Sequence, residues 1–240
     1  MKNIFLLGIP FFLLSCGDNN SAVNIDSLKT DSLLRAQMTA KAPDTTPVKD
    51  TTKGEVLPPV FEGDIVMQIS QNPKHLAFGK ACGSKYNHTG IIFIRPKDRM
   101  YVVMEANDTV TALPLREWAT RGEGKHIVVL RLKDSKQLLT EKKTMQLKKG
   151  AKDFRGKKED NFYGWSDDAF YSTELVWKVY NKSIAVAICE PGRLGDMNLT
   201  ETVFKEQMTK KYGGTIPAEE KFISPDAIYK SPKLEIIYER

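Results

Sequence analysis

The pattern of apolar and polar side chains divides the chain into three regions. An apolar run at 4–14 follows Lys2, and the tether-like region 17–58 contains a stretch of Thr, Pro, Lys and Asp at 41–53 with almost nothing to bury. Apolar residues with regular spacing begin only near Val60 and continue through the rest of the chain. Because only this last region can bury a sizeable apolar surface, we predict one folded domain at 59–240.

Within this domain the strand-like patterns come first. Alternating runs rich in β-branched residues predict strands at 64–69, 89–94, 100–106 and 126–132, with 109–112 as an extension of the sheet. Helical spacing predicts helices at 73–82, 134–151, 169–180 and 201–211, and a helical turn at 115–120. Strands that are segregated from helices favour an α+β fold with a small antiparallel sheet or barrel packed against helices.

The N-terminal apolar run is too short to cross a bilayer as a helix, which takes about 20 apolar residues. With its basic start it is typical of a secretory signal. Its end, Leu13-Leu14-Ser15-Cys16-Gly17, resembles the bacterial lipobox, in which the leader is cut before a cysteine that then carries acyl chains. We therefore expect a signal peptide at 1–15, a lipid on Cys16 and a tether at 16–58 that holds the domain on a membrane of the bacterial envelope. An ordinary signal peptide is the alternative.

The composition excludes several classes of protein. Lys and Arg number 36 against 30 acidic residues, and the two signs are interspersed, so we expect no nucleic-acid partner. The three cysteines, Cys16, Cys82 and Cys189, form no CxxC pair, and no cluster with metal-ligand spacing is evident. No glycine-rich phosphate loop of the common patterns occurs. We expect neither a metal nor a cofactor.

A hairpin places two residues with acid–base chemistry together. A turn centred on Pro96-Lys97 would put Ile94 opposite Arg99 and His88 opposite Glu105. Directly opposed side chains on one face have Cβ atoms about 4.5–5.5 Å apart. The carboxylate would then fix the imidazole tautomer and support its protonated form, as an orienter does for a general base. The alternative is an exposed cross-strand ion pair of little energetic value.

A base requires a nucleophile, and Ser172 is the strongest candidate. It begins a predicted apolar helix, where the helix dipole and free backbone N–H groups favour a developing negative charge. Serine is also a common helix N-cap, so a structural role is the alternative. Cys82 is a second candidate, although its apolar helix favours a packed thiol, and Cys189 is expected to be structural.

Four spaced blocks support this interpretation by resemblance. They are Gly-Asp-Ile-Val at 63–66, Tyr-Asn-His-Thr-Gly-Ile at 86–91, Met-Glu-Ala at 104–106, and the region 162–177, which contains Phe-Tyr-Ser-Thr-Glu-Leu-Val-Trp. In this order they resemble the YiiX-like permuted papain-fold amidases, which look like NlpC-type cell-wall cysteine peptidases with a circularly rearranged chain. The resemblance implies a papain-like fold, with His88 as base, Glu105 as orienter and position 172 as nucleophile.

The same blocks suggest four further pocket residues. Asp64 belongs to the Gly-Asp block, Tyr86 and Tyr171 lie close in sequence to His88 and Ser172, and Trp165 precedes the predicted nucleophile helix. Each has a structural alternative, a turn position for Asp64 and core packing for the three aromatic residues.

The sequence departs from the family pattern at the nucleophile. The family has Tyr-Cys-Ser-Glu-Leu-Val where this chain has Tyr-Ser-Thr-Glu-Leu-Val at 171–176. A thiol can rest as a thiolate beside an imidazolium, whereas a hydroxyl must lose its proton as it attacks. The serine is a natural variant, a mark of a pseudoenzyme or an engineered replacement, and we favour the first. We expect a site that still suits a thiolate–imidazolium pair, so that Ser172→Cys raises activity.

These observations predict a lipid-anchored hydrolase of the cell envelope. Its expected reaction is the hydrolysis of an amide bond through an acyl-enzyme, with a peptide, peptidoglycan or lipid-like substrate. One alternative is a catalytically inactive module that binds ligands in the same cleft. Another is a lipid acyl hydrolase or acyltransferase.

Overall fold

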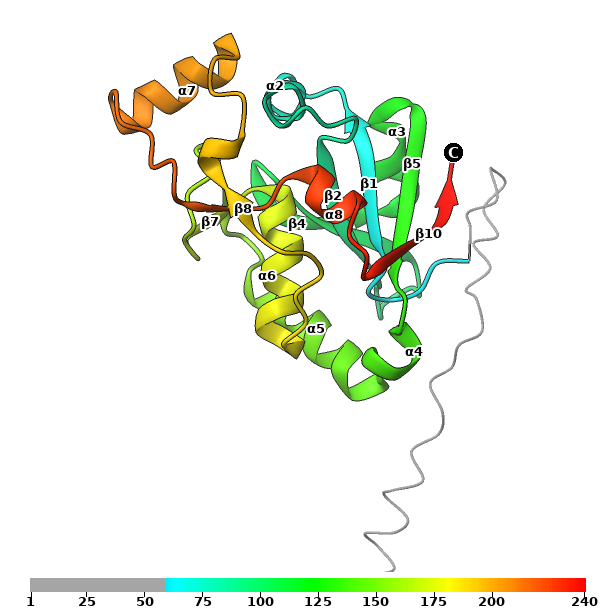
Figure 1. Ribbon diagram of the computed structural model, residues 1–240. Coiled ribbons are helices and arrows are strands. Elements are labelled where there is room, and N and C mark those ends of the chain that lie inside the picture. The colour runs from blue at the N-terminus through cyan, green and yellow to red at the C-terminus, as the bar shows by residue number, and fades with distance from the viewer. Residues whose placement is uncertain (1–58) are drawn as a thin grey trace, which may run out of the picture. The chain divides into compact units, whose positions relative to one another are not determined.

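The computed structural model describes residues 59–240, so the predicted leader at 1–15, Cys16 and the tether at 16–58 lie outside the described residues. Eight strands form one sheet in the order β10-β5-β1-β2-β3-β4-β6-β7, and all neighbours are antiparallel except β6 and β7 (Figure 1). The strands are β1 Ile65–Ser70, β2 His88–Ile94, β3 Tyr101–Asn107, β4 Thr109–Pro114, β5 Gly122–Leu132, β6 Lys158–Glu159, β7 Ala169–Phe170 and β10 Leu234–Glu239.

Helices and one small ribbon complete the domain. The helices are α2 Pro73–Cys82, α3 Leu115–Thr120, α4 Ser135–Leu138, α5 Glu141–Asp153, α6 Ser172–Ile184, α7 Thr202–Tyr212 and α8 Pro225–Tyr229, with a short 3₁₀ turn at Leu194–Asp196. The ribbon pairs β8 Gly192–Arg193 with β9 Lys221–Phe222. Within 59–240, none of these helices has the length and apolar character that a membrane crossing demands.

Helices cover both faces of the sheet, which explains why its central strands are almost continuously buried. On one face, side chains of β1, β2 and β3 pack against the apolar stripe of α6, which includes Leu175 and Val179. On the other face, Val66, Ile92 and Val103 pack against Trp118 of α3 and its neighbours. The structure therefore has two apolar cores separated by the sheet, in an α+β architecture.

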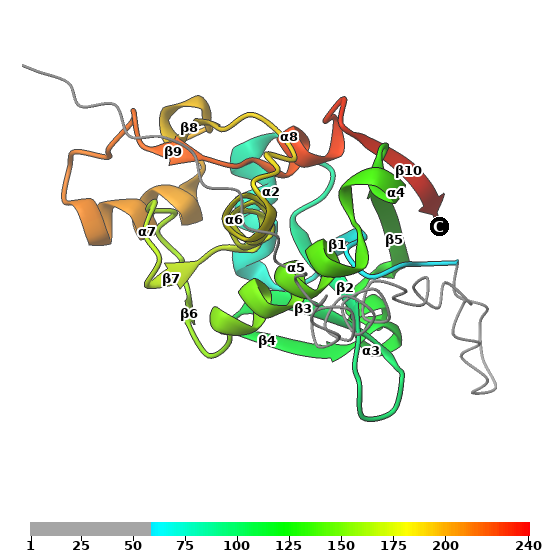
Figure 2. The same cartoon turned by 90° about the horizontal axis from the view of Figure 1, so that it is seen from below.

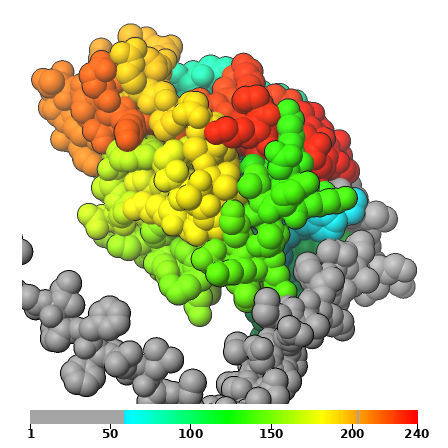
Figure 3. Space-filling model, turned by 60° about the horizontal axis from the view of Figure 1, so that its bottom comes forward, coloured from blue at the N-terminus to red at the C-terminus, as the bar shows by residue number. Residues whose placement is uncertain are grey.

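A third core joins α2 to the start of α6. It contains Phe78 of α2, Tyr171, and Phe204 of α7, with Phe222 of β9. Tyr171 stacks on Phe222 at 5.4 Å between ring centroids. Figure 2 shows α7, β8 and β9 at the end of the domain opposite to β10. In the space-filling view, α6 lies between α7 and the C-terminal segment (Figure 3). This core holds the first turn of α6 against α2.

Several predicted elements differ from the observed ones. The helix predicted at 134–151 is split into α4 and α5, because Thr140 starts a new helix by accepting a hydrogen bond from the Lys143 amide. The helix predicted at 169–180 begins only at Ser172, since Ala169 and Phe170 form β7 beside β6 and Tyr171 is the N-cap. The sheet is also larger than the small sheet that was expected, because β10 extends it beyond β5.

The hairpin register predicted from the turn was wrong by two residues. Ile94 pairs with Tyr101, not with Arg99, because the chain needs residues 95–100 for the turn. Arg99 adopts a left-handed conformation there, with φ of 60°, and the Arg95 amide donates to the Met100 carbonyl at 2.8 Å. A shift of two residues leaves every side chain on its original face, whereas a shift of one would have inverted the strand.

Close packing of this hairpin leaves no room for a side chain at Gly90. A Cβ atom at Gly90 would lie 2.4 Å from Val103 Cγ1 and 2.6 Å from the Met104 carbonyl oxygen. We expect Gly90→Ala to lower the free energy of unfolding by about 2–3 kcal/mol, because a backbone atom must move. Thermal unfolding would measure the loss. Gly214→Ala, where a Cβ meets nothing within 4 Å, should unfold like the wild type. Equal stability of the two variants would contradict the packing argument.

Candidate active site

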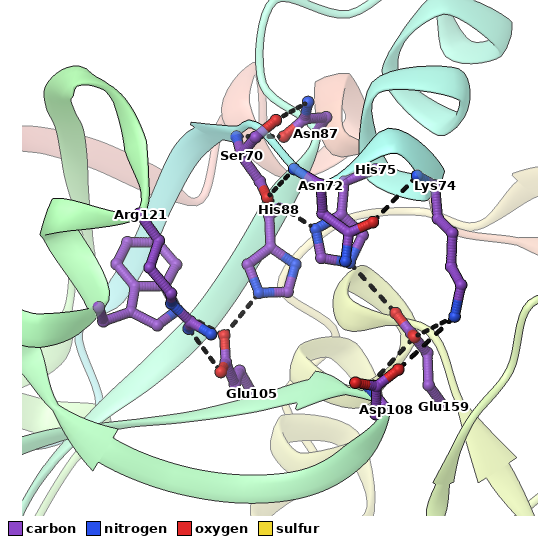
Figure 4. A network of polar contacts seen from close by, with 11 residues as sticks. Ser70, Asn72, Lys74, His75, Asn87, His88, Glu105, Asp108, Arg121 and Glu159 are labelled. Carbon is purple, nitrogen blue, oxygen red and sulfur yellow. Dashed lines mark hydrogen bonds and ion pairs between the residues drawn. The ribbon is translucent and has the colours of Figure 1, made fainter.

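His88 and Glu105 form a buried pair at the centre of the site. His88 is the first residue of β2 and Glu105 lies in β3, and His88 Nε2 is 2.6 Å from Glu105 Oε2 (Figure 4). In the observed register they are diagonal rather than direct neighbours, a separation that long side chains still bridge. The hydrogen bond predicted from the hairpin is present. Since both side chains are 2% exposed or less, the pair is not the surface ion pair of the alternative.

Two residues near the end of α3 complete the environment of Glu105. Trp118 Nε1 donates to Glu105 Oε2 at 2.7 Å, and Arg121 Nη2 donates to Oε1 at 2.5 Å. A carboxylate can only accept, so His88 must carry its proton on Nε2 when it is neutral. Its Nδ1 has no hydrogen-bond partner among the described residues. The ring is therefore fixed with a free nitrogen lone pair.

The two partners have opposite tendencies to hold charge. Burial, and then the neighbouring His75, lower the pKa of His88 to about 4, although Glu105 acts in the other direction. Burial alone would raise the pKa of Glu105, but the hydrogen bonds and charges of His88 and Arg121 outweigh it and lower the pKa to about 2. At neutral pH the pair thus rests as a neutral imidazole beside an ionised carboxylate.

A second histidine was missed from sequence. His75 of α2 stacks on His88 with ring centroids 4.2 Å apart and planes inclined by 10°. Its Nδ1 lies 2.9 Å from Ser70 Oγ, and its Nε2 lies 3.1 Å from Glu159 Oε1. Glu159 follows His75 by 84 residues, so no local spacing could have indicated this pair.

Ser172 opens into a narrow cleft beside this second pair. It is the first residue of α6, is 5% exposed, and its hydroxyl makes no hydrogen bond with any residue in 59–240. The cleft has a volume of about 10 Å³, room for roughly one water. It is lined by Lys74, His75, Phe78, Glu159, Asp160, Asn161, Tyr163, Tyr171 and Ser172. The structure therefore brings Ser172 to a cleft with His75, while His88 lies behind His75 and does not line it.

The loop before β7 forms one wall of the cleft and is tightly held. Asp160 accepts hydrogen bonds from the amides of Phe162 at 2.7 Å and Gly164 at 2.8 Å. Between them Tyr163 has a φ of 57°, a rare conformation for a bulky side chain, and its ring stacks on Phe78 at 4.9 Å. A strained residue held by its surroundings is a common feature of functional sites.

Of the four further pocket candidates, only Tyr171 lines the cleft. Asp64 lies at one end of β1, whereas Gln68, which pairs with His88, lies near the other end. Asp64 forms a bidentate ion pair with Arg131, with N–O distances of 2.7 and 2.8 Å. The structural alternative therefore describes Asp64 better.

The remaining two aromatic candidates also point elsewhere. The Tyr86 hydroxyl donates to Glu239 of β10 at 2.8 Å, and Trp165 packs edge-on against Trp177. Neither lines the cleft, and both contribute to packing, which was the alternative for each.

The cysteines of the described domain are poor nucleophiles. Cys82 Sγ lies against Met197 Sδ at 3.7 Å, and burial raises its pKa far above the ordinary range. Burial also raises the pKa of Cys189, to about 12. Both thiols are packed, as the sequence indicated. Within 59–240, no three His, Cys, Asp or Glu side chains are grouped as a metal site would need.

Comparison with known proteins shows where this geometry belongs. Residues 60–238 match the model of a family described as "permuted papain-like amidase enzyme, YaeF/YiiX, C92 family". The chain belongs to this family. Its members are amidase-type hydrolases, so the resemblance found in the sequence blocks is confirmed at the level of family and fold.

Two relatives from Escherichia coli cover most of the domain. The uncharacterized protein YiiX of strain K12 is 34% identical over 175 residues, which are 73% of this chain and 84% of that protein. The crystal structure of the metalloprotein YiiX from O157:H7 superposes with a TM-score of 0.67 at 32% identity and covers 75% of this chain and 97% of that one.

The neutral, buried His88 makes stability depend on pH. Its folded pKa of about 4 lies below the ordinary value of 6.5, so between these pH values the unfolded chain binds a proton that the folded one does not. The contribution to stability is complete above pH 6.5 and falls by roughly 3 kcal/mol as the pH drops to 4. Denaturant unfolding at a series of pH values should show this slope, and His88→Gln should flatten it. A slope that survives in His88→Gln would show that another group causes it.

Proposed function

We propose that this protein hydrolyses an amide bond through an acyl-enzyme, with Ser172 as nucleophile, His88 as general base and Glu105 as the residue that orients His88. The observation that carries the proposal is the buried pair in which Glu105 fixes His88 Nε2–H and leaves Nδ1 free, in a chain of an amidase family. A general base needs such a lone pair and a fixed tautomer.

The reaction follows from these groups. Ser172 Oγ bonds to the carbonyl carbon of the amide while His88 Nδ1 takes the hydroxyl proton. His88 then returns this proton to the leaving amine, the C–N bond breaks and an ester on Ser172 remains. A water molecule, deprotonated by the same ring, attacks that ester and releases the acid and the serine. The amides of the first turn of α6, which have no intrahelical acceptor, are the candidate donors for the developing oxyanion.

The resting cleft must change before a substrate fits. Ser172 makes no hydrogen bond to a described base, and about 10 Å³ is too small for a peptide group. Catalytic hydrogen bonds are often formed only in the substrate complex. The same observation favours the second candidate function, a module that binds a ligand without hydrolysis, and the labelling experiment below separates the two.

The thiolate–imidazolium pair expected from the family pattern and a serine nucleophile require different resting states of the histidine. Such a pair requires a histidine that readily holds a proton at rest, whereas burial lowers the pKa of His88 to about 4. A neutral imidazole is the form that removes a proton from a hydroxyl. We propose that a neutral His88 serves a serine nucleophile, and the gain of activity expected for Ser172→Cys stays a prediction from the family pattern.

The E. coli protein is described as a metalloprotein, and we do not extend a metal site to this chain. Glu105 accepts from His88, Trp118 and Arg121, while Glu159 accepts from His75 and from the Asp108 amide. Their carboxylate oxygens are thus already engaged, and no three His, Cys, Asp or Glu side chains of the described domain are grouped so that they could hold a metal ion. The residues present do not fit a metal centre, and the proposed route uses protein side chains alone.

We further propose that the substrate is an amide of the cell envelope, with a peptide of the cell wall as the leading class. The support is the lipobox-like end of the leader and the polar stretch that follows it, both outside the described residues. A lipid on Cys16 would keep the domain within a tether's length of such substrates. An acyl lipid is the alternative substrate.

Covalent labelling tests the nucleophile. A fluorophosphonate probe should label the wild type, and Ser172→Ala and His88→Gln should each reduce labelling by about 100-fold or more, because the hydroxyl is unreactive without a base. Ser183→Ala, near the other end of α6, serves as the matched control and should label normally. Turnover of amide and ester panels then assigns the bond: cleavage of lipid esters alone would replace the amidase proposal. No labelling and no turnover by a folded wild type would favour the binding module.

The predicted anchor has its own test. Mass spectrometry of the mature protein should find an N-terminus at Cys16 carrying acyl chains. Cys16→Ser should move the protein from the membrane fraction to the soluble fraction and leave its unfolding temperature unchanged, because residues 59–240 contain the folded domain. A mature chain that begins elsewhere without a lipid would contradict the lipoprotein proposal.

A further inference from the structure

Two stacked imidazole rings with separate carboxylates are the most unusual feature of the buried site. His75 and His88 are 6% and 1% exposed, and their rings lie nearly parallel, with centroids 4.2 Å apart (Figure 4). Glu105 contacts one ring and Glu159 contacts the other. Two imidazolium ions at this distance would repel each other strongly in a buried site. Once one ring is protonated, protonation of the other is therefore strongly disfavoured.

The hydrogen bonds of His75 suit a protonated ring. Its Nε2 faces Glu159 Oε1, which can only accept, so this nitrogen carries a proton. Its Nδ1 faces Ser70 Oγ, which can donate to a neutral ring or accept from a charged one. When His75 is an imidazolium, both of its N–H groups therefore have acceptors and one of these acceptors is a carboxylate.

The hydrogen bonds of His88 suit a neutral ring. Its Nε2–H is satisfied by Glu105, but its buried Nδ1 has no partner among the described residues. A second proton would create a buried N–H without an acceptor, which is costly. The charge of Glu105 is moreover shared with Arg121, whose Nη2 lies 2.5 Å from Oε1.

We propose that His75, paired with Glu159 and Ser70, holds the first proton of the stack and thereby keeps His88 neutral at rest. His75 is in this view a positioning residue that acts through His88. The consequence for catalysis rests on the proposed function, because a neutral His88 is the base that a serine nucleophile requires.

Other charged groups around the stack do not reverse this order. Lys74 on α2 lies 3.7 Å from Glu159 and 3.6 Å from Asp108, and its side chain is 42% exposed, so solvent weakens its effect on the pair. Asp160, which also lines the cleft, is engaged by two backbone amides. Arg121 faces His88 and disfavours its protonated form, and the charge of His75 also lowers the pKa of His88.

Histidine NMR on the intact chain tests the proposal without any turnover. The chain has three histidines, so ring ¹⁵N signals can be assigned with His75→Gln, His88→Gln and His126→Gln. On acidification, His75 should take up a proton first. Over the same range His88 should keep an unprotonated Nδ1 and a protonated Nε2, which their ¹⁵N shifts distinguish.

Variants then separate a tuning role from a structural one. Removing the neighbouring charge in His75→Gln should raise the titration midpoint of His88 by about one pH unit. Glu159→Gln should lower the midpoint of His75 and raise that of His88, and it serves if His75→Gln fails to fold. The control is His126→Gln. The His126 ring is partly buried, is hydrogen-bonded to Tyr86 and lies outside the cleft, so the titration midpoints of His75 and His88 should not change in this variant.

Protonation of His88 before His75 would overturn the proposal, and so would a His88 midpoint that stays unchanged in the folded charge-removing variants. These results are independent of the labelling experiment. A protein with the expected order of titration but no reactive Ser172 would refute the amidase proposal and leave the role of His75 intact. A protein with a reactive Ser172 in which His88 is protonated before His75 would refute the role proposed for His75 and leave the amidase proposal intact.

Discussion

The buried carboxylate of Glu105 is the group on which the arrangement of the site depends. An ionised carboxylate that is 1% exposed is tolerated only when donors surround it, and here three donors come from different parts of the chain. His88 arrives from β2, Trp118 from α3 and Arg121 from the residue that follows α3. Satisfying this one charge therefore fixes the short helix α3 against the sheet and fixes the His88 ring with Nε2–H towards β3. Loss of any donor would leave the carboxylate less well compensated and the ring less well oriented.

The position of Ser172 depends on packing rather than on charge. Helix α6 covers one face of the sheet through its apolar stripe, while α2, α7 and the ribbon β8–β9 surround its first turn with aromatic side chains. Tyr171 has its backbone at the N-cap of α6, its ring in this third core, and its hydroxyl accepting from the Ile223 amide at 3.0 Å. The start of α6 is thus held from outside the sheet, and His75 of α2 lines the cleft with Ser172 while it stacks on His88. The proposed site therefore combines residues of the sheet with residues held by the third core.

The sequence predicted those features that depend on local pattern. The observed bounds of α2 and α3 agree with those predicted from helical spacing, and His88 and Glu105 share a face because a strand alternates with period two. The predicted register of β2 and β3 was wrong because the conformation of residues 95–100 is not evident from composition. The error was two residues, an even number, so the prediction still placed His88 and Glu105 on the same face of the sheet. Trp118, Arg121 and the His75–Glu159 pair were missed, since each contact joins elements whose separation in sequence carries no period. Asp64 was placed near the site by a motif alone, whereas its neighbour Arg131 on β5 gives it a structural role.

In the proposed reaction, a serine in place of the family's cysteine changes what the base must do. A thiol becomes a better nucleophile when it transfers its proton to the histidine before the substrate binds. This requires a histidine whose imidazolium form is stable at rest. A hydroxyl gains nothing from a protonated neighbour, because only a neutral ring can receive its proton during attack. In this site the unpartnered Nδ1 of His88, the sharing of Glu105 with Arg121 and the adjacent His75 all disfavour the cation. A serine route needs His88 neutral at rest, but it also needs the same ring to accept the hydroxyl proton during attack, so these surroundings favour the resting form and at the same time make the ring a weaker base.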